Sequence, residues 1–480
     1  MRMRKLHILH TNDLHSHFEQ MPLLAGGIRA LQSSCEQRGE DVVIVDLGDH
    51  SDRMSPLTEG TWGEANVAVM NQTGYQFAAI GNNEGLTFPK EKLLSLYNSA
   101  NFQVICCNLK DEATADFPPF VKPYAIQEID SLRIGWISAT APYPVYEMLG
   151  WQILDPFDQI EQIVAQIRQQ TDVIIVLSHL GYKMDRELAN RLEGVDLIIG
   201  AHSHHLLQSG VVENGTFIIQ AGKFGNYLGH TTISIDMNTK RVIGVSGICR
   251  EATQFAPDQQ LSALIEQKRQ EADHTLNSLV TELAHPLVND WEEESPLGNL
   301  LAEGLRSWVE AELSMVNAGQ LLFSLPQGRV TRKDLLALCP HPINPCKVMI
   351  KGKYIKQLLE QALDEAVIHL EVQGLGFRGK VMGWMCIDGL SVHYHPRRQV
   401  GRRITEMYVQ GVPFQDERVY SVGTVDMFTF GWIFPLFREA EEIEYFFPEF
   451  IRDVLAKELS SVDALERSAK KRWILMNEGR

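Results

Sequence analysis

The chain has 480 residues, of which 44% are hydrophobic and 22% are charged, so it can bury a sizeable core and is not expected to be disordered. This length exceeds what one core usually serves and predicts two domains. The net charge of -17 argues against non-specific binding to nucleic acid or to an anionic membrane.

The N-terminus lacks the pattern of a secretion signal, because polar residues such as His7 and Asp13 interrupt the apolar segment that follows the basic start. No segment approaches the roughly 18 apolar residues of a membrane helix. The irregularly spaced cysteines favour reduced thiols. Cys339 and Cys346 are the one pair whose spacing suggests a bridge, and two free thiols are the preferred interpretation. We therefore predict a cytoplasmic protein.

The first 250 or so residues alternate short β-rich runs with amphipathic segments, which predicts a layered α/β fold. Several runs are apolar throughout, as in strands covered on both faces, and polar residues follow their carboxyl ends. Ligands bind at that edge in layered α/β folds. The predicted strands are residues 5–10, 42–47, 77–80, 103–107, 133–138, 173–177, 197–199, 217–220 and 231–235.

A polar amphipathic helix is predicted over residues 258–281 and ends before His285-Pro286. We interpret it as the connector between the domains, which places the first domain at 1–255, the linker helix at 256–285 and the second domain at 286–480. The second domain is expected to open with a helix at 295–301. Strands are expected at 348–350, 389–394 and 419–425, and a charge-mixed helical tail at 451–475.

Five short motifs place potential metal ligands just beyond predicted strands. Each motif alone is weak, since Gly-Asp turns and isolated histidines are common. Neighbouring strand ends let such side chains converge, and mixed carboxylate, amide and imidazole ligands suit Mn, Zn, Fe or Co better than Ca. The motifs are Asp13-Leu14-His15, Gly48-Asp49-His50, Gly81-Asn82-Asn83-Glu84, Ser178-His179-Leu180-Gly181 and Gly200-Ala201-His202-Ser203-His204-His205.

This ordered set closely resembles the calcineurin-like metallophosphoesterase superfamily. The segment Thr11-Asn12-Asp13-Leu14-His15-Ser16-His17 is similar to the opening of the 5′-nucleotidase branch, which includes UDP-sugar hydrolases and cyclic-nucleotide 2′,3′-phosphodiesterases. The resemblance covers most of the chain and is sharpest in its first half. It implies a four-layer α/β metallophosphatase sandwich followed by a C-terminal α+β domain of the 5′-nucleotidase type.

Carried over by motif, the resemblance implies two divalent ions, each Mn, Zn, Fe or Co, that clamp a phosphate and activate a bridging water. The position of His204 is often Gln in this branch, and either residue can ligate. The implied ligands are Asp13, His15 and His204 for one ion, Asn82, His179 and His202 for the other, and Asp49 for both.

The third motif departs from the family's Gly-Asn-His-Glu, because Asn83 stands at the His position and Leu86 at that of its acidic partner. Asn donates hydrogen bonds to a phosphoryl oxygen but cannot transfer a proton near neutral pH. It is also a common turn cap. Three interpretations stay open: His17, His50 or His205 supplies the proton, the substrate carries a good leaving group as a UDP-sugar does, or the chain binds nucleotides without rapid hydrolysis.

The segment Asn317-Ala318-Gly319 is similar to the family's substrate-binding Asn-x-Gly-Gly-x-Arg, although Gln320 follows and the Arg is missing. In the family, two aromatic rings of this domain sandwich the base. For every candidate here the alternative is plain core packing or a solvated loop. The candidate substrate contacts are Asn317, Phe377, Arg378, and Phe430 or Trp432.

These features predict a metal-dependent hydrolase of nucleotide phosphoesters, of the 5′-nucleotidase or UDP-sugar hydrolase type, whose partner is a small molecule. The catalytic candidates are Asn83, His50 and His17. The alternatives are a catalytically weak metal- and nucleotide-binding protein and a phosphoesterase that acts on a non-nucleotide substrate. The sequence does not indicate an oligomeric state.

Overall fold

The computed structural model describes residues 3–476, which divide between Thr275 and Leu276 into two compact units. This division falls inside the predicted connector. The connector helix α9 (Gln259–Leu276) ends earlier than residue 281, because β16 (Leu279–Leu283) pairs with β18 (Gly328–Thr331) instead of continuing the helix. Leu261 and Ile265 of α9 pack into the core of unit 1.

Unit 1 contains two sheets and the helices that cover them. The first sheet has the order β15-β14-β1-β2-β3-β4-β6 and the second has the order β12-β13-β11-β10-β8-β7. The first-sheet strands are β1 (Met3–Thr11), β2 (Asp41–Asp46), β3 (Phe77–Ala79), β4 (Gln103–Ile105), β6 (Val121–Lys122), β14 (Tyr227–Asp236) and β15 (Arg241–Glu251). The second-sheet strands are β7 (Tyr124–Ile129), β8 (Leu132–Thr140), β10 (Val173–His179), β11 (Leu197–Gly200), β12 (Val211–Glu213) and β13 (Thr216–Ile219).

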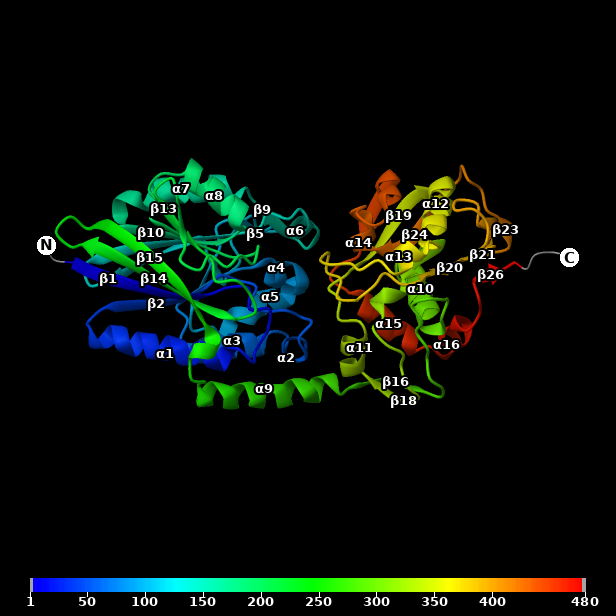
Figure 1. The fold of residues 1–480 in the computed structure, drawn as a ribbon, viewed down its shortest axis with the longest axis horizontal. Coiled ribbons are helices and arrows are strands. Elements are labelled where there is room, and N and C mark those ends of the chain that lie inside the picture. The colour runs from blue at the N-terminus through cyan, green and yellow to red at the C-terminus, as the bar shows by residue number, and fades with distance from the viewer. Residues whose placement is uncertain (1–2, 477–480) are drawn as a thin grey trace. The chain divides into compact units, whose positions relative to one another are not determined.

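The helices of unit 1 form the outer layers of a four-layer α/β sandwich (Figure 1), and this confirms the predicted architecture. One apolar core lies between the two sheets, and another lies on each outer face. The first sheet is covered by α1 (Met21–Gln37), α2 (Pro56–Thr61), α3 (Glu64–Thr73) and α5 (Lys90–Leu96), and the second by α7 (Pro156–Ile167) and α8 (Tyr182–Arg191). The short elements are α4 (Asn82–Thr87), α6 (Val145–Met148), β5 (Leu109–Asp111) and β9 (Trp151–Ile153).

The central strands of unit 1 run parallel, from β1 to β4 in one sheet and through β8, β10, β11 and β13 in the other. Every residue of β10 is buried, as the continuous apolar pattern predicts for a strand covered on both faces. Parallel strands end on the same side of their sheet, so the polar motifs that follow these strands are brought to one edge.

Unit 2 is an α+β domain with a five-stranded sheet, β20-β17-β24-β19-β25, and a four-stranded sheet, β23-β22-β21-β26. Its helices are α10 (Pro296–Trp308), α11 (Arg332–Leu338), α12 (Gly352–Ala362), α13 (Glu365–Ile368), α14 (Asp426–Thr429), α15 (Ile451–Leu459) and α16 (Val462–Ser468). Its sheet strands are β17 (Leu313–Asn317), β19 (Pro345–Lys351), β20 (Met385–Asp388), β21 (Leu390–Tyr394), β22 (Ile404–Val409), β23 (Val412–Pro413), β24 (Val419–Val425), β25 (Glu442–Tyr445) and β26 (Trp473–Leu475).

The prediction of a helical tail over residues 451–475 is wrong in its last part. The segment forms α15 and α16 and then β26, which pairs in parallel with β21. Trp473 is buried and packs edge-on against Trp384 and Tyr394. A partner strand far away in the sequence therefore decides the structure of this segment.

Two general expectations concern the membrane and the cysteines. In residues 3–476 no helix is both long enough and apolar enough to cross a membrane. All seven cysteines are buried free thiols, so Cys339 and Cys346 remain unpaired, as the preferred interpretation held.

Replacing Trp473 with Ala should lower the free energy of unfolding by about 3–5 kcal/mol, because it empties a buried indole site and loses the hydrogen bond from Nε1 to the Met385 carbonyl. The matched control is Ile474→Ala at the neighbouring, exposed position, where the loss should stay below about 1 kcal/mol. Urea unfolding followed by circular dichroism measures both. Equal losses would contradict the anchoring role of Trp473.

Candidate metal centre

All seven predicted ligand residues lie at the carboxyl ends of parallel strands in unit 1. Three of the positions follow strands of the first sheet: the loops after β1 and β2, and the start of α4 after β3. The others are at the second sheet, at the end of β10 and in the segment after β11. Two groups of donor atoms result. The residues, in strand order, are Asp13 and His15, Asp49, Asn82, His179, and His202 and His204.

The first group joins His15 and His204, whose Nε2 atoms lie 3.2 Å apart. His204 Nε2 is 3.6 Å from Asp13 Oδ1, and His15 Nε2 is 3.7 Å from Asp49 Oδ2. One donor atom from each of Asp13, His15 and His204 lies within 4.8 Å of the other two. Three side chains from two loops far apart in the sequence thus converge on one point.

The second group is centred on Asn82 Oδ1, which lies 2.8 Å from His202 Nδ1 and 3.3 Å from His179 Nε2. The Nδ1 atom of His179 donates a hydrogen bond of 2.7 Å to the Leu47 carbonyl. That bond fixes the imidazole tautomer and leaves the Nε2 lone pair facing the group, as a metal ligand requires.

Asp49 lies between the two groups. Its Oδ2 faces His15, and its Oδ1 is 3.5 Å from His179 Nε2. Burial opposes ionisation of this carboxyl, but the nearby imidazoles of His179 and His15 hold its pKa well below the usual range. A carboxylate with one oxygen toward each group has the geometry of a bridging ligand, and the mixed donor set fits borderline divalent ions.

The backbone of the ligand loops is held in an unusual conformation. Residues other than Gly rarely adopt a positive φ, and such strain gathers at functional sites. Five of the seven predicted ligands adopt it: Asp13 (48°), His15 (47°), Asp49 (51°), His202 (71°) and His204 (59°).

Two loops approach so closely around Asp49 that one position admits only Gly. A Cβ on Gly81 would lie 2.1 Å from Asp49 Oδ1. The carboxylate of Glu84 joins the same loops, because it accepts backbone N–H bonds from Asp49, Ser51 and Gly81 at 2.8 to 3.0 Å. Glu84, the last residue of the third motif, therefore fixes Asp49 in place.

Asn83 contacts His15 of the first group and Asp49 without belonging to the predicted ligand set. Its backbone N–H donates to Asp49 Oδ1 at 2.8 Å. Its side-chain amide lies 2.7 Å from His15 Nδ1, on the opposite side of the ring from His204. Its carbonyl accepts a bond from the Thr87 hydroxyl, so the residue also stabilises the first turn of α4.

The three imidazoles considered as proton donors point elsewhere. His50 is buried, its Nδ1 lies 3.1 Å from Asn66 Nδ2, and burial lowers its pKa to about 3. The ring of His17 lies 2.7 Å from Glu19, and His205 Nδ1 lies 2.9 Å from the Ser203 hydroxyl. Within residues 3–476, none of these ring nitrogens hydrogen-bonds to a predicted ligand.

Two aromatic residues beside the site were not predicted. The ring of Phe224 lies 5.9 Å from that of His15 and 4.2 Å from that of His17, and the Tyr143 hydroxyl lies 3.0 Å from His202 Nε2. Both follow parallel strands, β13 and β8. Their place at carboxyl strand ends was the signal available in the sequence, but aromatic residues there carry no metal-ligand pattern.

In unit 2 the candidate substrate contacts differ in exposure. Asn317 is fully buried, and its side-chain amide donates to the Met382 carbonyl. Phe377 is buried and stacks on His341, whose Nδ1 accepts a bond from the backbone N–H of Arg378. Phe430 is 42% exposed and Trp432 is 72% exposed, so these two rings are open to a ligand.

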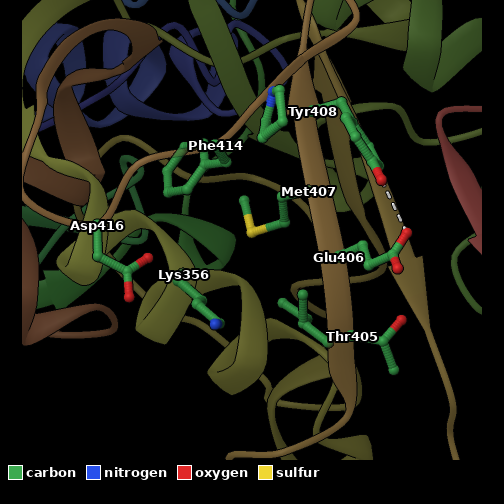
Figure 2. A pocket seen from close by; sticks show the side chains of 9 residues that line it. Lys356, Thr405, Glu406, Met407, Tyr408, Phe414 and Asp416 are labelled. Carbon is green, nitrogen blue, oxygen red and sulfur yellow. Dashed lines mark hydrogen bonds between the residues drawn. The ribbon is translucent and has the colours of Figure 1, made fainter.

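Unit 2 also has a surface cavity of about 260 Å³ beside β22 and α12 (Figure 2). Its walls include Lys356, Phe414 and Asp416, and Tyr408 donates a hydrogen bond of 2.9 Å to Glu406. None of the predicted substrate residues lines this cavity. It therefore gives no support to those candidates.

Two family models match the sequence: calcineurin-like phosphoesterase over residues 6–206 and 5′-nucleotidase, C-terminal domain, over residues 278–433. The uncharacterized metallophosphoesterase YunD of Bacillus subtilis is 39% identical over 459 residues, covering 95% of this chain and 99% of that protein.

Solved structures share the fold over nearly the whole chain. A putative 5′-nucleotidase from Staphylococcus aureus has a TM-score of 0.67 at 17% identity and covers 98% of this chain and 100% of its own. A 5′-nucleotidase precursor from Thermus thermophilus has a TM-score of 0.58 at 22% identity and covers 99% and 100%. At these identities the likeness shows the fold alone.

Replacing Gly81 with Ala should weaken Mn²⁺ binding at least about tenfold, because the added methyl displaces the Asp49 carboxylate while the φ of −89° itself suits alanine. The matched control is Gly244→Ala in β15, where no atom lies within 4 Å of the added carbon. Isothermal titration calorimetry measures both variants. Unchanged affinity in Gly81→Ala would contradict the role given to Asp49.

Proposed function

Because the chain belongs to the calcineurin-like phosphoesterases that carry a 5′-nucleotidase C-terminal domain, we propose that it hydrolyses nucleotide phosphoesters, of the 5′-nucleotidase or UDP-sugar hydrolase type, with two divalent ions. The placement of Asp49 between two groups of donor atoms carries the proposal. Two ions bound there would clamp a phosphate and provide a water activated for attack. Their proposed ligands are Asp13, His15, Asp49, Asn82, His179, His202 and His204.

The donor set also fits the charge of the substrate. The chain is strongly acidic, and a phosphoester is an anion, so its binding requires local positive charge. Two carboxylates, one amide and four imidazoles leave a pair of divalent ions with net positive charge. Mn, Zn, Fe and Co remain the proposed ions, since these ligands suit borderline metals.

We assign Asn83 a positioning role. To bind an ion through Nε2, His15 must carry its proton on Nδ1, and that proton needs an acceptor. A half-turn of the Asn83 amide exchanges Nδ2 with Oδ1, so that the oxygen faces His15 Nδ1 and accepts this bond. Asn83 thus orients a metal ligand, whereas proton donation to a leaving group is beyond its chemistry.

In the part of the chain that the structure describes, none of the three histidines considered as proton donors forms a hydrogen bond with a proposed ligand. This favours a substrate whose leaving group needs no proton from a side chain. His50 is enclosed, and both His17 and His205 are engaged by neighbouring polar groups. A diphosphate bond, as in a UDP-sugar, has a good leaving group and meets this condition. Exposed Phe430 and Trp432 are the proposed stacking surfaces for a base.

The cytoplasm remains the proposed location. The seven cysteines are free thiols, which is the state expected in a reducing compartment. The proposed partner is a small phosphoester.

The central test is hydrolysis by the full chain after reconstitution with Mn²⁺, Zn²⁺ or Co²⁺. Substrates are an aryl phosphate, nucleoside 5′-monophosphates, UDP-sugars and 2′,3′-cyclic nucleotides. Chelation should abolish turnover, and Asp49→Asn should lower kcat/KM by about a thousandfold, the equivalent of several kcal/mol of lost charge stabilisation. Asp158→Asn on the exposed face of α7 is the matched control and should retain full activity.

The outcome also separates the alternatives. Turnover of the aryl phosphate alone would favour a non-nucleotide phosphoesterase. Tight nucleotide binding with no product under any metal would refute the hydrolase and leave the catalytically weak binding protein, the alternative that Asn83, Leu86 and Gln320 suggest.

Asn83→Ala should raise the metal dissociation constant by about 10- to 100-fold while excess Mn²⁺ restores kcat, because the variant loses the amide partner of His15 Nδ1 but no reacting group. The Asp52 carboxylate, 3.6 Å from the same nitrogen, remains in the variant. Asn190→Ala, at an exposed position of α8, is the control. The measurement is activity as a function of Mn²⁺ concentration. A lower kcat that saturating metal does not restore would show instead that Asn83 acts on the phosphate.

A further inference from the structure

A second cluster of potential metal ligands lies on the outer face of the first sheet. It joins β1, β14 and the last turns of α1, which packs over these strands (Figure 1). Its members are His7, Cys35 and His230, and one ligand atom from each lies within 4.8 Å of the other two. His7 and Cys35 are buried and His230 is partly exposed.

Strand register brings the two histidines together. In the antiparallel pair of β1 and β14, His7 faces Thr232 and Leu9 faces His230, so His7 and His230 are diagonal neighbours on one face. His7 Nδ1 lies 2.9 Å from His230 Nε2. This separation resembles the 3.2 Å between His15 and His204 in the proposed centre.

Glu40 completes the arrangement. Its carboxylate lies 3.1 Å from His7 Nε2, so it accepts the proton of that nitrogen and leaves the Nδ1 lone pair facing His230. A carboxylate behind an imidazole is the usual support of a metal-binding His. The Thr232 hydroxyl lies 3.1 Å from the same Nδ1.

The thiol of Cys35 has its own polar neighbour. Arg38 Nη2 lies 3.2 Å from Cys35 Sγ, and Arg38 Nε pairs with Glu40 at 2.6 Å. Burial raises the pKa of the Cys35 thiol, and the Arg38 guanidinium opposes that shift. An ion that binds Sγ must therefore displace the thiol proton, because the thiolate is the form that binds metals.

This cluster is separate from the centre at the strand ends. Strand β1 continues from His7 to Thr11, about 13 Å further at the usual rise per residue, before the first predicted ligand of that centre. None of the seven ligands proposed there is a cysteine. The two sites therefore differ in place and in chemistry.

We propose that Cys35 Sγ, His7 Nδ1 and His230 Nε2 bind one thiophilic divalent cation of the Zn²⁺ class. Sulfur and imidazole donors select such ions over Mg²⁺ or Mn²⁺. The ion would join α1 to β1 and β14 at a point remote from the phosphoester site. This is a structural site, and it stands whether or not the proposed function holds.

Titration of the full chain with Co²⁺ tests the proposal, because only a cysteine ligand produces thiolate-to-cobalt charge-transfer absorption. The band should saturate within three equivalents of Co²⁺, because the proposed phosphoester centre takes up to two ions without a cysteine ligand, and it should disappear in Cys35→Ser and persist in Cys249→Ser. Cys249 is the matched control, since it is a buried thiol of the same unit that belongs to none of the three potential metal groups found in residues 3–476.

A second variant covers the case in which Cys35→Ser misfolds, as judged by circular dichroism. His230→Gln changes a partly exposed ring and should weaken cobalt affinity at least about tenfold. A wild-type chain without the band at saturating Co²⁺ overturns the proposal, and so does a band of unchanged intensity and affinity in either variant. Loss of phosphoesterase activity alone has no bearing on this site.

Discussion

The position of one carboxylate, that of Asp49, is the constraint on which the site depends. A carboxylate can face two groups of donors only if its backbone is fixed and neighbouring loops leave it room. Gly81 provides the room, and Glu84 fixes the backbone by accepting three N–H bonds from the loops on either side. The imidazoles of His15 and His179 then stabilise the charge.

The surrounding fold is arranged to sustain this constraint. Parallel strands deliver each ligand loop to one edge of its sheet, while the core between the sheets holds the two edges together. Five of the predicted ligand residues adopt positive φ, and each such residue costs of order 1 kcal/mol or more. Such backbone strain persists only where the surrounding packing fixes the conformation. Strand β10, which ends at the site, is buried along its whole length.

Asn83 shows how one substitution redistributes roles within a site of this kind. An amide in place of an imidazole removes a proton donor but keeps a polar group beside the ring of His15. In the function proposed above, the chemistry then depends more heavily on the ions and on the leaving group. The same logic of ring orientation recurs at His7, where Glu40 takes the part of the acceptor.

The sequence by itself determined the layered α/β fold of unit 1, because continuous apolar runs and strand-end polar residues are local patterns. The resemblance of its motifs implied the four-layer arrangement and the seven candidate ligands. It did not determine contacts that depend on long-range pairing. The segment around Trp473 has the composition of a helix, but its end pairs with β21 as a strand. Helix α9 stops at Leu276 because the residues that follow it pair with β18. Tertiary structure alone enclosed His50 and Phe377, exposed Phe430, and placed His7 beside His230 and Cys35, since burial and diagonal strand contacts follow from packing that no local pattern records.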